Sequence, residues 1–227
     1  MPQAGDHAED AVKLWPTRYL THQSTDSECN NASRTALIIL NSPIADYGLF
    51  KCLYHHASFR VCADGGANRL YKLIHESCKD LDTTISLRDS RPDIIHGDLD
   101  SLDDNVRNEY SKLGVEISLD GDQYSTDFGK AIKKIIDRSG DIENVLVLGS
   151  IGGRVDQGIG LLHEFYREQK FRHPGIRFWL ISESSISTVL RPGRTVLHTP
   201  LNQGTIERNI GILPLYGPAS ISTEGLE

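Results

Sequence analysis

The chain has 227 residues, with 24 Lys and Arg against 31 Asp and Glu, which gives a formal net charge of −7 at pH 7. Hydrophobic residues make up 38% and charged residues 24% of the chain, a globular composition that excludes a disordered or fibrous protein. A sequence pI near 5.7 argues against a general nucleic-acid binder, because such proteins carry a basic face. One phosphate-binding site remains compatible with this charge, since a metal ion can supply the positive charge locally.

No apolar run approaches the roughly 20 residues that a membrane-spanning helix needs, and the first residues lack the charged-then-apolar pattern of a signal peptide. The four cysteines show neither C-x-x-C nor zinc-finger spacing, so we expect reduced, buried thiols rather than a metal site. They are Cys29, Cys52, Cys62 and Cys78. We therefore expect a cytoplasmic protein with no membrane and no nucleic-acid partner.

Residues 1–34 are polar without sustained periodicity, which predicts an N-terminal extension docked through Trp15 and Tyr19. Over residues 35–184, short apolar runs alternate with segments of helical period. Strands that alternate with helices predict an α/β domain with a mostly parallel sheet flanked by helices. The predicted strands are Ala36–Leu40, Phe59–Ala63, Asp93–His96, Val115–Leu119, Val145–Leu148 and Ile176–Ile181.

Two later segments, Thr126–Arg138 and Val155–Gln169, place apolar residues at i, i+3, i+4 and i+7 and are predicted as helices. After about Glu183 no helical period remains, and short strand-like runs are separated by turns such as Arg191–Arg194. This pattern predicts a small antiparallel β domain over residues 185–227. Its predicted strands are Ile186–Leu190, Thr195–His198, Ile210–Leu213 and Ser220–Ser222.

Four acid- or Gly-rich segments follow predicted strands. The first, Cys62–Arg69, runs from a strand into Asp64, two glycines and the start of a helix. Glycines let a ligand approach the backbone closely, and a helix N-terminus favours an anion. The alternative is an ordinary turn in which Asp64 caps the helix.

The second segment, Pro92–Ser101, contains Asp98 and Asp100 two positions apart, so both project to one side of an extended backbone. Two carboxylates on one side repel each other unless a cation lies between them. Mg²⁺ suits such oxygen ligands and keeps part of its shell for water and substrate phosphates. The alternative is a polar loop closed by an Asx-turn.

The third segment, Asp120–Lys130, crowds polar groups before a predicted helix whose free N–H groups could bind phosphate. Lys130 lies one turn inside that helix. The alternative is helix capping by Ser125 or Thr126, with Asp127 favoured by the helix dipole.

The fourth segment, Leu148–Gln157, again leads from a strand through glycines into a helix. It is not G-x-G-x-x-G, and the chain has no G-x-x-x-x-G-K-[ST], which excludes a dinucleotide fingerprint and a P-loop. Arg154 could hold a phosphate with its planar guanidinium, or it could form an exposed pair with Asp156 that contributes little stability. Because ligands of open α/β sheets bind at the carboxyl ends of the strands, the four segments together favour a Mg-nucleotide site built from carboxylates.

These segments resemble, in order and spacing, the motifs of the thiamin pyrophosphokinase family, especially its fungal members. The motifs are CADGGANRLY at 62–71, PDIIHGDLDS at 92–101, DQYSTDFGKAI at 122–132 and LGSIGGRVDQ at 148–157. Two further runs, LRPGRTVLH at 190–198 and STEGLE at 222–227, extend the resemblance into the β region. The resemblance implies an α/β domain followed by a thiamine-binding β-sandwich, a homodimer, and transfer of pyrophosphate from ATP to the thiamine hydroxyl, which gives thiamine diphosphate and AMP.

Matched position by position, the resemblance implies four catalytic and metal-binding carboxylates that serve Mg²⁺ and the triphosphate: Asp64, Asp98, Asp100 and Asp127. It implies ATP contacts for a second set, which consists of Gly65, Asn68, Gln123, Ser125, Thr126, Lys130, Arg154, Asp156 and Gln157. It leaves open which of Asp98, Asp100 and Asp127 accepts the proton of the thiamine hydroxyl.

In the family, a strand with a Trp and further strands follow the Gly-Leu pair found here at Gly225–Leu226, so we expect a shortened β-sandwich with an incomplete thiamine side. Three other hypotheses use the same residues: a nucleotide-binding remnant without a complete thiamine pocket, a pyrophosphokinase for another alcohol such as a pterin, and a D-x-D glycosyltransferase. ATP–Mg binding without AMP release would favour the remnant. The glycosyltransferase leaves three of the four segments unexplained.

Overall fold

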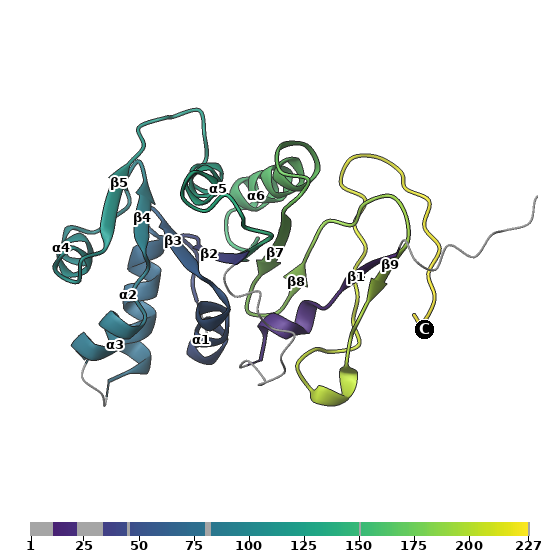
Figure 1. The fold of residues 1–227 in the computed structure, drawn as a ribbon, viewed down its shortest axis with the longest axis horizontal. Coiled ribbons are helices and arrows are strands. Elements are labelled where there is room, and N and C mark those ends of the chain that lie inside the picture. The colour runs from purple at the N-terminus through teal and green to yellow at the C-terminus, as the bar shows by residue number, and fades with distance from the viewer. Residues whose placement is uncertain (1–10, 22–33, 45, 80–82, 150, 227) are drawn as a thin grey trace, which may run out of the picture.

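The computed structural model describes residues 11–21, 34–44, 46–79, 83–149 and 151–226, and its centre is a seven-stranded sheet in the order β5-β4-β3-β2-β6-β7-β8 (Figure 1). The strands of this sheet are β2 (Thr35–Ile39), β3 (Phe59–Ala63), β4 (Ile94–Gly97), β5 (Glu116–Leu119), β6 (Asn144–Leu148), β7 (Arg177–Ile181) and β8 (Ile186–Ser187). Every pairing is parallel except that of β7 with β8. The predicted α/β class with a mostly parallel sheet is confirmed, as are all the strands predicted between residues 36 and 181.

Helices cover both faces of the sheet, with α1 to α4 on one side and α5 and α6 on the other (Figure 1). Their bounds are α1 (Tyr47–His56), α2 (Gly66–Ser77), α3 (Thr83–Asp89), α4 (Asp104–Lys112), α5 (Asp127–Arg138) and α6 (Val155–Arg167). Along β2 the side chains alternate, so that Ala36 and Ile38 pack with α5 and α6 while Leu37 and Ile39 pack with α1 and α2. Both faces of the sheet are buried beneath helices, which explains why the central strands are continuous apolar runs.

Helix α5 begins where the sequence predicts, because the Thr126 hydroxyl accepts a hydrogen bond from the Gly129 N–H at 3.2 Å. Helix α6 ends at Arg167, and a π-helical turn, Glu168–Arg172, follows it directly. The side chain of Gln169 links this turn to the sheet: its Oε1 accepts from the Phe178 N–H at 2.9 Å, and its Nε2 donates to the Ile176 carbonyl at 2.6 Å. Within the described residues, no helix is long and apolar enough to span a membrane.

The described N-terminal residues pack onto the rest of the chain. Strand β1 (Val12–Leu14) pairs in parallel with β9 (Thr195–Leu197), and Trp15 stacks on His198 with ring centroids 4.5 Å apart. Tyr19, in the 3-10 turn Pro16–Tyr19, is 1% exposed. The docking predicted for Trp15 and Tyr19 is thus confirmed, while residues 1–10 and 22–33, with Cys29, lie outside the described residues.

Past β9 the predicted strands are wrong. The predictions at 186–190 and 195–198 correspond to the short strands β8 and β9, but Ile210–Leu213 and Ser220–Ser222 form no strand. A strand is stable only against a hydrogen-bonded neighbour, and these segments have none among the described residues. Accordingly Ile210 remains 48% and Ile221 60% exposed.

Gly66, the first residue of α2, allows this helix to lie directly against β2. A Cβ at Gly66 would stand 2.1 Å from the Ile39 carbonyl oxygen, which is backbone and cannot move aside. We expect Gly66→Ala to lower the free energy of unfolding in urea by about 2 kcal/mol, as overpacking does. Gly140→Ala, where nothing lies within 4 Å of the new Cβ, is the matched control and should change it by less than about 0.5 kcal/mol. Equal stability of the two variants would contradict this close contact.

Candidate functional site

The strand order reverses between β2 and β6, since the chain moves to one side of β2 through β3, β4 and β5 and to the other side through β6 and β7. Ligands of doubly wound sheets bind at such a point, outside the carboxyl ends of the strands. The first three segments identified in the sequence meet at this edge. The Ser101 N–H donates to Asp64, and Lys130 forms an ion pair with Asp98.

Asp64, directly after β3, is the most buried carboxylate of the site, with 1% exposure. Its backbone φ of 44° lies in the left-handed region that a non-glycine residue rarely adopts. Its Oδ2 accepts the Ser101 N–H at 3.2 Å, whereas Oδ1 is buried and has no hydrogen-bond partner among the described residues. A buried carboxylate oxygen without a donor is costly, and a cation bound at this atom would offset that cost.

Asp98 and Asp100 complete an oxygen cluster with Asp64. One carboxylate oxygen from each of the three lies within 4.8 Å of the others. Leu99, between the two aspartates, also has a positive φ, 62°. Gly97 allows the close approach, because a Cβ there would lie 2.9 Å from the Asp64 Cβ. Three carboxylates from two neighbouring strand ends form a donor set that suits a hard divalent cation such as Mg²⁺.

Asp127 borders this cluster from the first turn of α5. Its Oδ1 would lie 3.3 Å from a Cβ placed on Gly97. Burial, together with the negative charges of Asp64 and Asp98, raises the pKa of Asp127 to about 6. The structure therefore places Asp127 beside the three clustered carboxylates, but outside the group of oxygens that lie within 4.8 Å of one another.

Lys130 is the cation of the cluster and is itself 2% exposed. Its Nζ lies 3.3 Å from Asp98 Oδ2 and 4.0 Å from Asp127 Oδ1. Burial raises the pKa of Asp98, but the hydrogen bond and charge of Lys130 outweigh that effect, so the pKa is lowered overall. Burial raises the pKa of Asp64, which no lysine or arginine contacts among the described ion pairs. Among the described residues, Lys130 thus contacts two of the four carboxylates, and the site has an excess of negative charge.

The loop before α5 is folded by its own side chains. Ser125 Oγ donates to Asp122, and Thr126 Oγ1 both caps the helix and donates to Glu164. Capping by Thr126, one of the two readings of this segment, is therefore confirmed. The loop and Lys130, together with residues of α6 and the π-helical turn, line a cavity of about 340 Å³, and none of the four carboxylates is among its lining residues. Gln123 is exposed at its tip.

Two residues expected to contact ATP have partners within the protein. The Asn68 Nδ2 donates to the Ser101 carbonyl at 2.7 Å, and its Oδ1 accepts the Asp103 N–H at 3.1 Å. Asn68 thus fixes the loop that carries Asp100. Gly65 provides space for Asn41, whose Nδ2 would lie 2.4 Å from a Cβ at position 65.

The fourth segment lies at the carboxyl end of β6, across β2 from Asp64. Arg154, Asp156 and Gln157 are all exposed at the start of α6. Arg154 Nε donates to Asp156 Oδ1 at 3.1 Å, as in the alternative of an exposed pair. Among the described residues, the side chains of Arg154 and Asp156 therefore contact each other. Ser150, in the same segment, lies outside the described residues.

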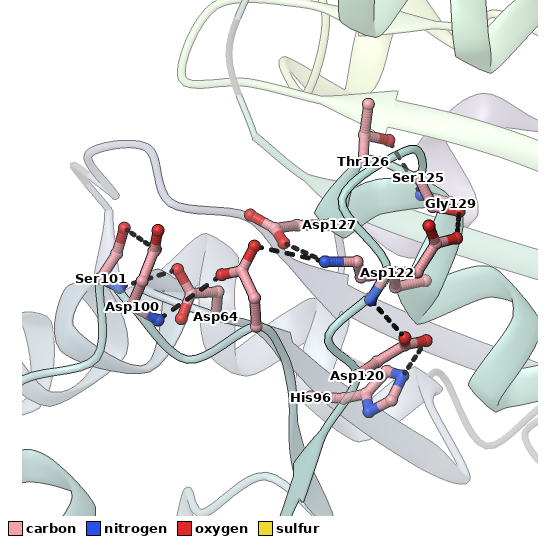
Figure 2. Close-up of polar contacts among 12 residues, drawn as sticks. Asp64, His96, Asp100, Ser101, Asp120, Asp122, Ser125, Thr126, Asp127 and Gly129 are labelled. Carbon is pink, nitrogen blue, oxygen red and sulfur yellow. Dashed lines mark hydrogen bonds and ion pairs between the residues drawn. The ribbon is translucent and has the colours of Figure 1, made fainter.

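The sequence analysis did not predict a series of polar contacts from His96 through Asp120 to Asp122, which supports the loop before α5 (Figure 2). On β4, the Nδ1 of His96 lies 3.0 Å from the Ser118 carbonyl and its Nε2 lies 3.8 Å from Asp120 Oδ2. Asp120 Oδ1 in turn accepts the Asp122 N–H at 3.1 Å. Burial lowers the pKa of His96. Only the register of β4 against β5, which pairs His96 with Ser118, brings these residues together, and no local motif encodes that register.

Comparison with known proteins gives consistent matches. The family model for "Thiamin pyrophosphokinase, catalytic domain" matches residues 50–178. Thiamine pyrophosphokinase 1 of Arabidopsis thaliana is 31% identical over 207 residues, which cover 88% of this chain and 74% of that protein. Thiamine pyrophosphokinase 1 of Oryza sativa subsp. japonica is 34% identical over 202 residues, which cover 84% and 72%.

Solved structures show the same fold. The thiamin pyrophosphokinase from Candida albicans superposes with a TM-score of 0.64 at 24% identity, over 83% of this chain and 68% of that one. The yeast thiamin pyrophosphokinase gives a TM-score of 0.63 at 23% identity, over 82% and 68%. At these identities the likeness supports the fold.

The raised pKa of Asp127 predicts a pH-dependent stability. Because the folded-state pKa of about 6 exceeds the ordinary value of 3.8, the free energy of unfolding should fall as the pH rises from about 4 through about 6. Asp127→Asn should remove that part of the decrease and stabilise the protein at pH 7 in the absence of divalent cations. We expect a gain of about 1 kcal/mol, because the side chain is 40% exposed and solvent screens its charge.

Urea unfolding at pH 4, 5, 6 and 7 measures this effect. Asp104→Asn, an exposed aspartate at the start of α4, is the control and should follow the wild-type profile. A profile for Asp127→Asn that parallels the wild type would contradict the raised pKa.

Proposed function

This chain belongs to the thiamin pyrophosphokinase family, and we propose that it transfers pyrophosphate from ATP to the hydroxyl of thiamine, forming thiamine diphosphate and AMP. The family match over residues 50–178 and the relatives named thiamine pyrophosphokinase support this activity. The structural observation that best supports this activity is the buried Asp64 Oδ1. It lies beside two further carboxylates and lacks a hydrogen-bond partner within the residues that the structure describes.

The donor set fits Mg²⁺, which we propose as the metal held by Asp64, Asp98 and Asp100 with Asp127 beside them. All the candidate ligands are carboxylate oxygens, the ligands that Mg²⁺ prefers, and a cation here would satisfy the orphaned oxygen of Asp64. When bound, Mg²⁺ offsets negative charge on the triphosphate and on the transition state.

The remaining steps belong to side chains of the chain itself. Lys130 keeps Asp98 ionised and in place through its 3.3 Å contact. We assign the triphosphate to the N-terminus of α5 and to the loop that carries Gln123, Ser125 and Thr126, where free N–H groups favour an anion. Arg154, Asp156 and Gln157 would contact the nucleotide from α6. One of the carboxylates Asp98, Asp100 and Asp127 accepts the hydroxyl proton while the oxygen attacks the β-phosphorus in line with the departing AMP.

The division of labour proposed for the chain places ATP on residues 35–184 and thiamine on residues 185–227, with residues 1–34 as an extension. We also propose a homodimer in the cytoplasm. Exposed apolar side chains support a partner copy, since Val155 on α6 is 72% exposed and Ile159 is 63% exposed, and large exposed apolar surface marks association sites.

Asp98→Asn tests the activity. The substitution keeps the shape of the side chain but removes one charge from the cluster, so we expect AMP release with thiamine and Mg-ATP to fall by about 100-fold or more. Asp104→Asn, an exposed aspartate outside the cluster, should retain wild-type turnover. The assay is AMP release from ATP with and without thiamine. Wild-type turnover in Asp98→Asn, or AMP release that does not depend on thiamine, would contradict the proposal.

Metal binding gives a readout that does not depend on turnover. Saturating Mg²⁺ should raise the Tm of the wild-type chain by a few degrees, because a ligand at about 100 times its Kd stabilises the folded state by about 2.7 kcal/mol. The double variant Asp98→Asn with Asp100→Asn should show no such shift, while Asp104→Asn keeps it. Equal Mg²⁺ shifts in the double variant and the wild type would assign the metal elsewhere.

A further inference from the structure

A second cavity, of about 300 Å³, lies at the amino ends of β6 and β7 and is lined also by β1 and by the 3-10 turn after it. Because these strands are parallel, this cavity is at the opposite edge of the sheet from Asp64 and its neighbours. Nothing in the activity proposed above uses it.

The cavity is strongly basic in a chain whose net charge is −7. Four cationic side chains line it: Lys13, Arg18, Arg177 and Arg191. Its one carboxylate, Glu143, already forms an ion pair with Arg34 at 2.7 Å. No ion pair joins any of the four cations to a carboxylate within the described part of the chain.

Neutral oxygens hold the guanidinium groups in place and leave donors free. Arg177 Nη1 donates to the Val189 carbonyl at 2.8 Å, and Arg191 Nη2 donates to the Pro174 carbonyl. Arg18 Nη2 donates to the Tyr19 hydroxyl at 2.5 Å, with its guanidinium 4.5 Å over that ring. A guanidinium has five N–H donors, so each retains N–H groups for a ligand.

Two of these positive charges oppose each other. Burial lowers the pKa of the Arg177 guanidinium, and the charge of Arg191 lowers it further. Like charges gathered in a partly desolvated cavity destabilise the folded state unless an anion joins them. Planar guanidinium groups match the oxygens of phosphates in a bidentate geometry.

We propose that this cavity binds the diphosphate group of a small anion and that it does so without a metal ion. Four cations from separate segments can neutralise several negative charges at once, which favours a diphosphate over a single carboxylate. The volume accommodates a small molecule rather than a macromolecular chain. The proposal does not depend on the activity proposed above, because the carboxylate cluster requires a cation to hold phosphate whereas this cavity supplies its own positive charge.

The tryptophans make the proposal testable in the intact chain. Trp15 and Trp179 are the only two tryptophans of the sequence, and both line this cavity. Inorganic pyrophosphate, titrated in excess EDTA with selective tryptophan excitation, should therefore give a saturable change in fluorescence, and calorimetry should give the same Kd. ADP, titrated in the same way, tests whether the cavity takes a diphosphate attached to an organic group as well as free pyrophosphate. Binding of either probe that depends on the arginines supports the site.

Arg177→Gln combined with Arg191→Gln should raise the Kd for pyrophosphate about 100-fold, since each lost charge-assisted hydrogen bond weakens binding about tenfold. Arg191→Gln and Lys13→Gln, both at exposed positions, should each weaken binding by a smaller factor and keep the test open if the double variant fails to fold. Arg138→Gln, an exposed arginine paired with Glu116 at the far edge of the sheet, is the matched control.

Asp98→Asn separates this site from the catalytic one, because it should abolish AMP release and leave pyrophosphate binding in EDTA unchanged. No fluorescence change and no heat would overturn the proposal. Binding that survives the arginine substitutions, or that weakens equally in Arg138→Gln, would overturn it as well.

Discussion

The carboxylate of Asp64 is the constraint on which the site depends. It follows β3 in a left-handed backbone conformation, is 1% exposed, and has no donor for Oδ1 in the described part of the chain. Such an arrangement costs stability in an apo protein, and the left-handed φ of Leu99 adds to that cost. Both costs become understandable when a cation enters the space between Asp64, Asp98 and Asp100. The space left by Gly97 serves the same purpose, since it lets the end of β4 lie close to Asp64 at the end of β3.

The sequence predicted the α/β fold well because the central strands are buried on both faces and appear as short apolar runs with helical segments between them. The segments Cys62–Arg69 and Pro92–Ser101 could be assigned to one site from the sequence, because ligands bind at the carboxyl ends of parallel strands. Local patterns failed where a partner decides the outcome. Ile210–Leu213 has the composition of a strand but no neighbour to pair with among the described residues. His96 and Asp120 meet only through the register of β4 with β5.

The two edges of the sheet carry opposite charge. Within the part of the chain that the structure describes, an excess of carboxylates lies with one ammonium, that of Lys130, at the carboxyl ends of β3 and β4, while arginines without carboxylate partners gather at the amino ends of β6 and β7. In a chain of net charge −7, this separation means that phosphate at the first edge needs a cation, whereas phosphate at the second does not. Phosphate chemistry at the two edges can therefore be separated experimentally by removing divalent metal.

The most direct test of the central claim compares Mn²⁺ binding by the wild type and by Asp64→Asn. Electron paramagnetic resonance in the presence of ATP measures the affinity and stoichiometry of Mn²⁺ for each protein. The account predicts a tight Mn²⁺ site in the wild-type chain that is lost or greatly weakened when the Asp64 carboxylate becomes an amide of the same shape, while circular dichroism shows an unchanged fold. Equal affinity and stoichiometry in the two proteins would contradict the claim that the unpaired oxygen of Asp64 belongs to a metal site.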